Sequence, residues 1–150
     1  MRYRQITDIS GENTYLERWT LIIPFIGWSI KLHKISRADD DRCQHDHPWW
    51  FFRIILWGGY EETVGNNLKV KKRRMFNMSF CGKNFRHRII KLYRTSSWSL
   101  VVTGRNSGKW GFYTKLGYMT WQSFVDAARS ARVLWCGDGR VLNEDEEKSK

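Results

Sequence analysis

The sequence is poor in cysteine and contains no long apolar run. Its three cysteines, Cys43, Cys81 and Cys136, show no Cys-x-x-Cys spacing. A small, odd number of cysteines argues against a disulfide scaffold and for a reducing compartment. No run approaches the roughly 20 apolar residues of a membrane helix, and the first residues lack the apolar segment of a signal peptide. We therefore expect a cytosolic protein with no membrane partner.

Acidic residues are missing from the middle of the chain. No Asp or Glu occurs between Thr63 and Val125, whereas thirteen Lys or Arg do, and the net charge is +11. This balance favours anionic partners such as nucleotides, nucleic acid or acidic surfaces, although a solvated basic surface gives the same pattern. Nine Trp, eight Phe and six Tyr in 150 residues are enough to fill a β-barrel or to line a pocket. The length suits one domain with its own core.

Short β-prone runs separated by turn residues dominate the sequence. They cover residues 15–23, 28–35, 45–60, 68–75, 84–92, 97–103 and 109–114. Thr120 is a suitable N-cap for a helix over 121–131. Several short strands followed by one helix predict an antiparallel sandwich or small barrel with a short C-terminal α-helix. We expect an extended lead-in over 1–14, the barrel and its helix over 15–135, and a charged, disordered tail over 136–150.

Three of the four histidines lie on two of these predicted strands. His45 and His47 are two residues apart, so their side chains share a face of an extended strand. His87 lies on a later strand, and three imidazoles brought together would form a metal site. His33 lies on another strand without a ligand-like neighbour in sequence, so a hydrogen-bonded histidine of the barrel wall is an alternative to a binding role.

The histidine spacing resembles the motifs of the cupin family. His45-x-His47, Gly58 and His87 follow the order of Gly-(x)5-His-x-His-(x)3,4-Glu-(x)6-Gly and of a second motif with a third histidine. The chain is also similar to cupin-like proteins of bacterial and bacteriophage genomes over about residues 15–124. The matching segments are Tyr15-Leu16-Glu17-Arg18-Trp19, His45-Asp46-His47-Pro48-Trp49, Gly58-Gly59-Tyr60, His87-Arg88-Ile89, Thr103-Gly104, Trp110-Gly111-Phe112 and Trp121. The resemblance implies a single cupin-type antiparallel β-barrel (jelly roll) and allows a homodimer.

One position departs from the cupin motif. The motif's Glu falls at Phe51 or Phe52, neither of which has a carboxylate, so the predicted site is His45, His47 and His87 with open positions. Three neutral imidazoles suit a divalent transition metal such as Fe, Zn, Ni or Cu. Two alternatives stay open. Cys43 has the same strand parity as the histidine pair and would complete a Cys-His-His-His zinc site, or the barrel has lost its metal and keeps the histidines for hydrogen bonding.

The same parity predicts a ligand pocket beside the histidines. Its predicted residues are Trp49, Phe51, Arg53, Trp57, Phe85, Lys91 and His33. An inward Arg53 needs an anionic partner, and no acidic residue lies near it in sequence. The phosphate or carboxylate of a ligand would supply that partner. A bulge at Pro48 would instead turn Arg53 to solvent.

Three functions fit these patterns. The first is a protein that binds a small anionic ligand, phosphorylated or nucleotide-like; if the gene belongs to a phage, the ligand would be a host signalling nucleotide sequestered in the host cytoplasm. The second is a metal-dependent oxygenase, isomerase or hydrolase, against which stand the missing carboxylate and an Asp46 expected on the opposite face. The third is nucleic-acid binding through the basic run 69–74, for which a solvated edge strand is the alternative.

Overall fold

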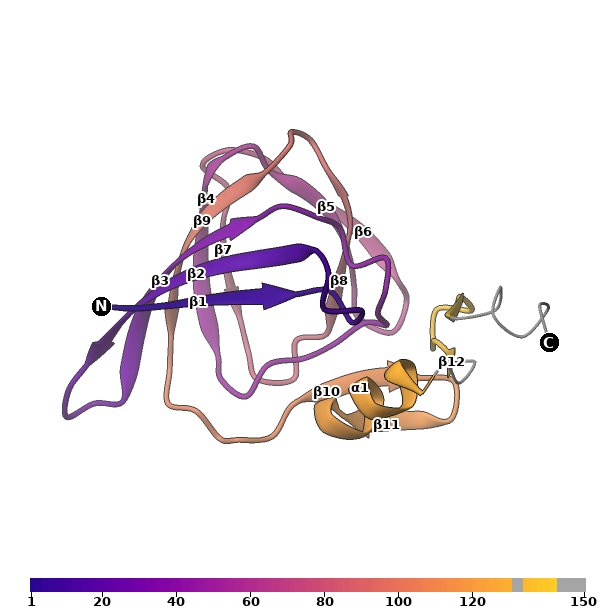
Figure 1. The fold of residues 1–150 in the computed structure, drawn as a ribbon. Helices are drawn as coiled ribbons and strands as arrows, with labels where there is room; N and C mark the ends of the chain where they lie inside the picture. Colours follow the sequence, from indigo (N-terminus) through magenta and orange to yellow (C-terminus); the bar gives the residue numbers. More distant parts are fainter. Residues whose placement is uncertain (131–133, 143–150) are drawn as a thin grey trace.

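The computed structural model describes residues 1–130 and 134–142, and antiparallel strands make up most of them (Figure 1). The strands are β1 Arg2–Thr7, β2 Thr14–Ile23, β3 Trp28–Ile35, β4 Phe51–Trp57, β5 Tyr60–Val64, β6 Lys69–Arg73, β7 Met78–Cys81, β8 His87–Leu92, β9 Ser97–Thr103, β10 Gly111–Thr114, β11 Gly117–Thr120, β12 Leu134–Trp135 and β13 Val141–Leu142. Helix α1 spans Trp121–Arg129. Among the described residues, no helix has the length and apolar character needed to cross a membrane.

Two sheets form the barrel. The larger has the strand order β1-β2-β3-β9-β4-β7, the smaller the order β6-β5-β8, and neighbouring strands in both are antiparallel. Figure 1 shows β10, β11 and α1 together at one end of the barrel. The all-β barrel with one short helix, predicted from the sequence, is therefore confirmed.

The predicted strand over 45–60 is two strands and a leading segment. Gly58 and Gly59, with φ values of 72° and 105°, separate β4 from β5. A Cβ on Gly58 would lie 2.3 Å from the backbone oxygen of Ser96, so only glycine fits this close turn. Before β4, His45 forms isolated bridges to two other strands instead of extending β4. The histidine pair is thus held outside the regular sheet.

The helix closes the barrel end through its apolar side. The Thr120 side chain accepts a hydrogen bond from the Ser123 backbone N–H, as the predicted N-cap requires. Phe124 and Ala128 are buried, and the Phe124 ring stacks on Phe112 with 4.0 Å between centroids. The predicted end at residue 131 lies outside the described residues, and α1 ends at Arg129.

The C-terminal segment is attached to the barrel by a disulfide bond. Cys43 and Cys136 are bonded, which corrects the expectation from the odd cysteine count, while Cys81 is free and buried. The bond also removes Cys43 as a zinc ligand. Residues 136–142 of the predicted tail include strand β13, and the rest of that tail lies outside the described residues.

Candidate metal centre and ligand cavity

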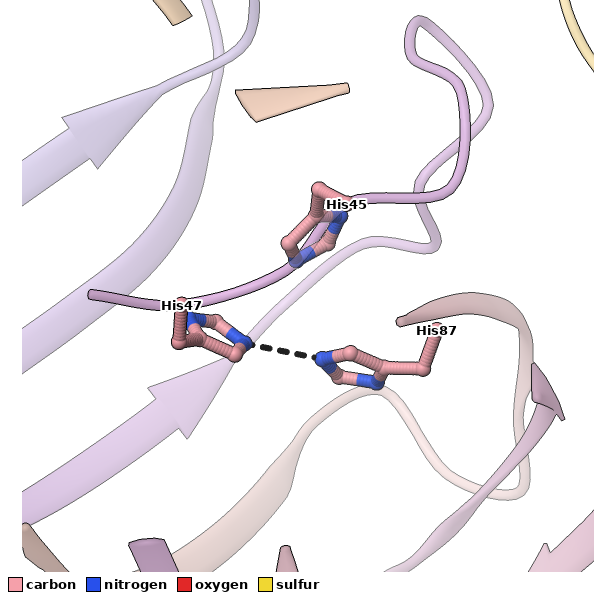
Figure 2. Close-up of side chains that lie close together, drawn as sticks. All are labelled: His45, His47 and His87. Carbon is pink, nitrogen blue, oxygen red and sulfur yellow. Dashed lines mark hydrogen bonds between the residues drawn. The ribbon is translucent and has the colours of Figure 1, made fainter. Parts of the chain in front are cut away.

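Three histidine side chains converge inside the barrel (Figure 2). His45 and His47 precede β4, and His87 begins β8. His45 and His87 exchange two backbone hydrogen bonds of 2.9 Å, which fix the two segments side by side. One ring nitrogen from each of the three histidines lies within 4.8 Å of the others. The Nε2 atoms of His47 and His87 are 2.9 Å apart.

A buried carboxylate holds His87 in place. Glu62 Oε2 lies 2.8 Å from His87 Nδ1, so Nδ1 carries a proton and donates it to the carboxylate. Burial by itself raises the pKa of Glu62, but the hydrogen bond from His87 and the charge of Arg53 hold it well below its usual range. The carboxylate is therefore ionised. By holding Nδ1, it orients Nε2 of His87 toward the other two rings.

Burial keeps His45 and His47 neutral. It lowers the pKa of His45 to about 4, with His87 and Arg42 adding to the effect and Asp39 opposing it. Burial also lowers the pKa of His47, as do its neighbours His45 and His87. Neutral imidazoles are the form that binds transition metals.

The donor set fits a transition metal ion. Nitrogen ligands lie about 2.0–2.1 Å from such an ion, so two of them are at most about 4.2 Å apart. A small side-chain adjustment from the present separations, all within 4.8 Å, brings the three nitrogens onto one ion. His45 Nδ1 is buried without a hydrogen-bond partner among the described residues. Such an atom is expected to gain a partner, and an ion or its water ligands supply one.

The position of the missing motif carboxylate is apolar. Phe51 is buried, and its ring lies 5.1 Å from the His47 ring and 6.3 Å from the His87 ring. Glu62 stands behind His87 and does not take that position. Asp46 accepts hydrogen bonds from Gly111 and Tyr113, so its carboxylate is engaged with β10. The three histidines thus leave open positions at the centre.

A cavity of about 590 Å³ opens beside the histidines. Its lining includes all three of them and the predicted pocket residues Trp49, Phe51, Arg53 and His33. A volume of this size suits a small molecule. A hollow of about 650 Å³ near the β5–β6 turn is more open and has no histidine in its lining. The less open, histidine-lined cavity is therefore the candidate ligand site.

Arg53 points inward as predicted, but its anionic partner belongs to the protein. Its guanidinium donates to both oxygens of Glu62 and to the Tyr60 hydroxyl. Glu62 also accepts from Arg73 at 2.7 Å. The expectation that Arg53 lacks an acidic neighbour is wrong, because Glu62 lies on the next strand with its side chain inward. Arg53 is thus not free to bind a ligand anion.

Two predicted pocket residues lie on the outside of the barrel. The β4–β9 pairing shifts between Ile55 and Trp57, and Trp57 is 53% exposed. The β5–β8 pairing shifts between Glu61 and Glu62, and Lys91 faces solvent. Each irregularity adds one residue and reverses the face that simple alternation predicts. Phe85 packs against Phe51 beside the cavity, with 6.0 Å between ring centroids.

The basic run is an edge strand with one inward member. Strand β6 is at the edge of the three-stranded sheet, as expected. Lys69, Lys71, Lys72 and Arg74 are exposed, whereas Arg73 is buried against Glu62. Arg73 is therefore unavailable for the nucleic-acid contact that the sequence suggested.

Sequence reasoning missed Glu62. Its alternation with Tyr60 and Val64, which are both apolar, was the available signal, since residues two apart in a strand share a face. Arg18 and Lys31, both on the inner side of the larger sheet, were missed as well.

No protein-family model and no curated protein matches the sequence. A cupin-2 domain protein from Rhodospirillum rubrum superposes with a TM-score of 0.59 at 12% identity, covering 86% of this chain and 85% of that one. A cupin 2 conserved barrel domain protein from Rhodopseudomonas palustris gives 0.53 at 13%, covering 68% and 69%. The iron(II) form of HppE gives 0.54 at 13%, covering 68% of this chain and 56% of HppE. The chain has the cupin fold.

Proposed function

We propose that the protein binds a transition metal ion through His45, His47 and His87 and is a metal-dependent enzyme acting on a small molecule in the adjoining cavity. The observation that carries the proposal is the convergence of three imidazoles on one point, with His87 fixed by a buried carboxylate. Histidine ligands held by such a carboxylate are typical of metal centres. The iron(II) state of HppE, which shares the fold, supports it further.

The chain's own residues prepare the site for this chemistry. When bound, a transition metal ion supplies Lewis acidity or redox chemistry at its open positions. Glu62 holds the proton of His87 at Nδ1, which leaves Nε2 for the metal. Phe51 and Phe85 cover the imidazoles with apolar rings and limit water at that side. The cavity gives a substrate access to the same point.

The nucleotide-binding hypothesis has lost one of its supports. It relied on an unpaired Arg53, which Glu62 neutralises. Sequestration of a signalling nucleotide by a phage protein stays a prediction.

Elemental analysis of protein purified without a metal-binding tag and without chelator tests the metal centre. We expect about one transition metal ion per chain in the wild type, as in other three-histidine sites. His87→Gln should lose most of it. The matched control is His33→Gln, which changes a histidine of the same barrel outside the cluster and should keep its metal. Equal metal content in the two variants, or none in the wild type after exposure to Fe, Zn, Ni and Cu, contradicts the proposal.

A further inference from the structure

Three basic side chains and one histidine gather on the inner face of one wall of the barrel. Strand pairing aligns Arg4, Arg18 and His33 in one row across β1, β2 and β3. Lys31 precedes His33 by two residues on β3, so it faces the same side. Arg4, Arg18 and His33 line the cavity, and Lys31 is buried beside it against Trp49. These four residues are called the cationic wall.

Arg18 presents free donors to the cavity. Its Nε donates to His33 Nε2 at 3.1 Å, and this fixes the guanidinium against the wall. Neither of its terminal nitrogens has a hydrogen-bond partner among the described residues, and neither is sealed away from the cavity. A guanidinium anchored through Nε keeps its two outer nitrogens as a fork for an oxyanion.

Lys31 is a buried ammonium with no counter-ion among the described residues. Its Nζ donates to Thr103 Oγ1 at 3.1 Å and lies 3.5 Å from the centroid of the Trp49 ring. Burial, together with the charge of Arg18, lowers the pKa of Lys31 to about 7. The same two causes, burial first, lower the pKa of His33. A buried cation is unfavourable unless an anion compensates it.

Three other arginines of the barrel do have carboxylate partners. Arg53 and Arg73 share Glu62, and Arg42 pairs with Asp41. The acidic residue of the cavity lining is Asp8, which is occupied by Arg37 and by hydrogen bonds from Ser10 and Asn13. No ion pair joins the cationic wall to a carboxylate among the described residues. Within the described residues, the positive charge of Arg18 and Lys31 therefore has no compensating carboxylate.

We infer that the cationic wall binds the oxyanion group, a carboxylate or a phosphate, of the small molecule that enters the cavity. Arg18 is the principal contact, Lys31 supplies a second positive charge, and His33 positions Arg18. The rest of the molecule lies toward Trp49 and the three histidines, which share the cavity. The oxyanion would belong to the substrate of the proposed metal enzyme, which makes that substrate a carboxylate or a phosphate. Only the role of this ligand as a substrate rests on the proposed function.

Titration calorimetry on chelator-treated protein tests the anion site separately from the metal. The probes are inorganic phosphate and benzoate, at ionic strength held constant with chloride. At least one probe should bind the wild type, and Arg18→Met should weaken that binding by about tenfold or more, since it removes the charged fork. Lys31→Met replaces a buried ammonium with an apolar chain of similar length. It should fold and should also bind the probe more weakly than the wild type. Arg94→Met is the matched control, because Arg94 lies over Trp57 on the outside of the barrel.

The two proposals fail in different ways. If His87→Gln loses its metal but binds the probe like the wild type, both are supported. A different result overturns the anion site alone. In that result Arg18→Met keeps its metal, and both Arg18→Met and Lys31→Met bind the probe as tightly as Arg94→Met does. Failure of both probes to bind the wild type also overturns the anion site.

Discussion

Glu62 connects the buried charges of the smaller sheet to the histidine cluster. It is fully buried and accepts hydrogen bonds from Arg53, Arg73 and His87. Two guanidinium groups facing one carboxylate leave a net positive charge. Glu62 thus stabilises the fold by pairing with the two arginines, and it also orients His87.

Glu62→Gln should destabilise the protein by about 3–5 kcal/mol, the usual range when one partner of a buried ion pair is removed. The amide keeps the volume but leaves two buried guanidinium groups without a negative charge. Guanidinium chloride unfolding measures the difference. Glu61→Gln is the control, since Glu61 accepts only a 3.2 Å hydrogen bond from the Tyr93 hydroxyl at the part-exposed side of the strand. Similar losses in both variants would contradict the role given to Glu62.

The buried histidines should make the metal-free protein less stable in acid. Burial lowers the pKa of His45 to about 4 and also lowers those of His33 and His47, whereas an unfolded histidine titrates near 6.5. Below about pH 6.5 the unfolded chain therefore binds more protons, and stability falls as the pH falls. Glu62, whose folded pKa is depressed, adds a further loss below about pH 4.3.

Each histidine contributes up to about 1.4 kcal/mol per pH unit inside this window. Urea midpoints between pH 7.5 and 4.5 give the slope, and His33→Gln should make it shallower. A midpoint that does not change over this range would show that the histidines are protonated in the folded protein.

Individual side chains were predictable only where the strand is regular. Alternation correctly placed Phe51 and Arg53 inside, because β4 is regular between them. It failed at Trp57 and Lys91, each of which follows a shift in strand pairing. Such shifts depend on how two distant strands meet, which one strand's sequence does not show. The partner of Arg53 was missed for the same reason, since an ion pair between strands needs the register.

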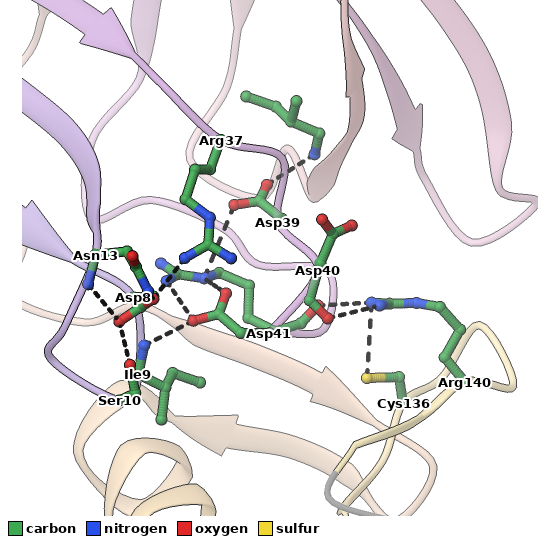
Figure 3. Close-up of polar contacts among 12 residues, drawn as sticks. Asp8, Ile9, Ser10, Asn13, Arg37, Asp39, Asp40, Asp41, Cys136 and Arg140 are labelled. Carbon is green, nitrogen blue, oxygen red and sulfur yellow. Dashed lines mark hydrogen bonds and ion pairs between the residues drawn. The ribbon is translucent and has the colours of Figure 1, made fainter. Parts of the chain in front are cut away.

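At the scale of elements, the loop between β3 and the histidine pair is fixed by its aspartates (Figure 3). Asp39 is fully buried, accepts a 2.7 Å hydrogen bond from the Ile89 N–H and donates its own N–H to Ile89 O at 2.8 Å. Asp41 accepts from the Ile9 N–H at 2.7 Å. Asp39 and Asp41 thus order this loop and help to place His45 next to β8.

The disulfide bond fixes the end of the same loop. Cys43 is two residues before His45, and its partner Cys136 is 93 residues away in sequence. Both cysteines are buried in a cluster with Phe112 and Phe124. Arg140 reinforces the contact by donating to the backbone oxygens of Asp40 and Arg42 (Figure 3).

Cys136→Ser should therefore lower the free energy of unfolding by about 2–5 kcal/mol relative to the oxidised wild type, as for other disulfides that close long loops. A reducing agent should lower the wild type to the level of Cys136→Ser and leave the variant unchanged, which controls for other effects of the reagent. Thermal unfolding with and without dithiothreitol measures both. Insensitivity of the wild type to reduction would show that the bond does not stabilise the fold.

Element boundaries followed the strength of local signals. The strands over 28–35 and 97–103 and the helix start at Trp121 were predicted correctly from alternation, turn residues and the Thr120 cap. The run over 45–60 was read as one strand because it is apolar throughout, although Gly58-Gly59 marks the turn. The cysteine pairing was not predictable from an odd count, since it depends on α1 and β12 lying against the loop before the histidines.

For the molecule as a whole, the outer face of the larger sheet is apolar across five strands. The strand pairing aligns two rows, Trp19-Leu32-Leu100-Ile54-Met78 and Leu21-Ile30-Val102-Phe52-Phe80. Leu21, Met78 and Phe80 are each more than half exposed. Contiguous apolar patches of this extent are uncommon on monomers and indicate an interface.

We expect this face to pair with the same face of a second copy. Two identical sheet faces related by a two-fold axis are self-complementary, and sheets pack face to face through apolar side chains. Phe80→Glu should then convert a dimer to a monomer, because two copies of a carboxylate would be buried near the axis without partners. Leu116→Glu is the control, since Leu116 is equally apolar, 96% exposed and lies in the β10–β11 turn, away from this sheet. Light scattering after size exclusion gives the mass of each variant at micromolar concentrations. A monomeric wild type would contradict the dimer and leave the apolar face for a different protein partner.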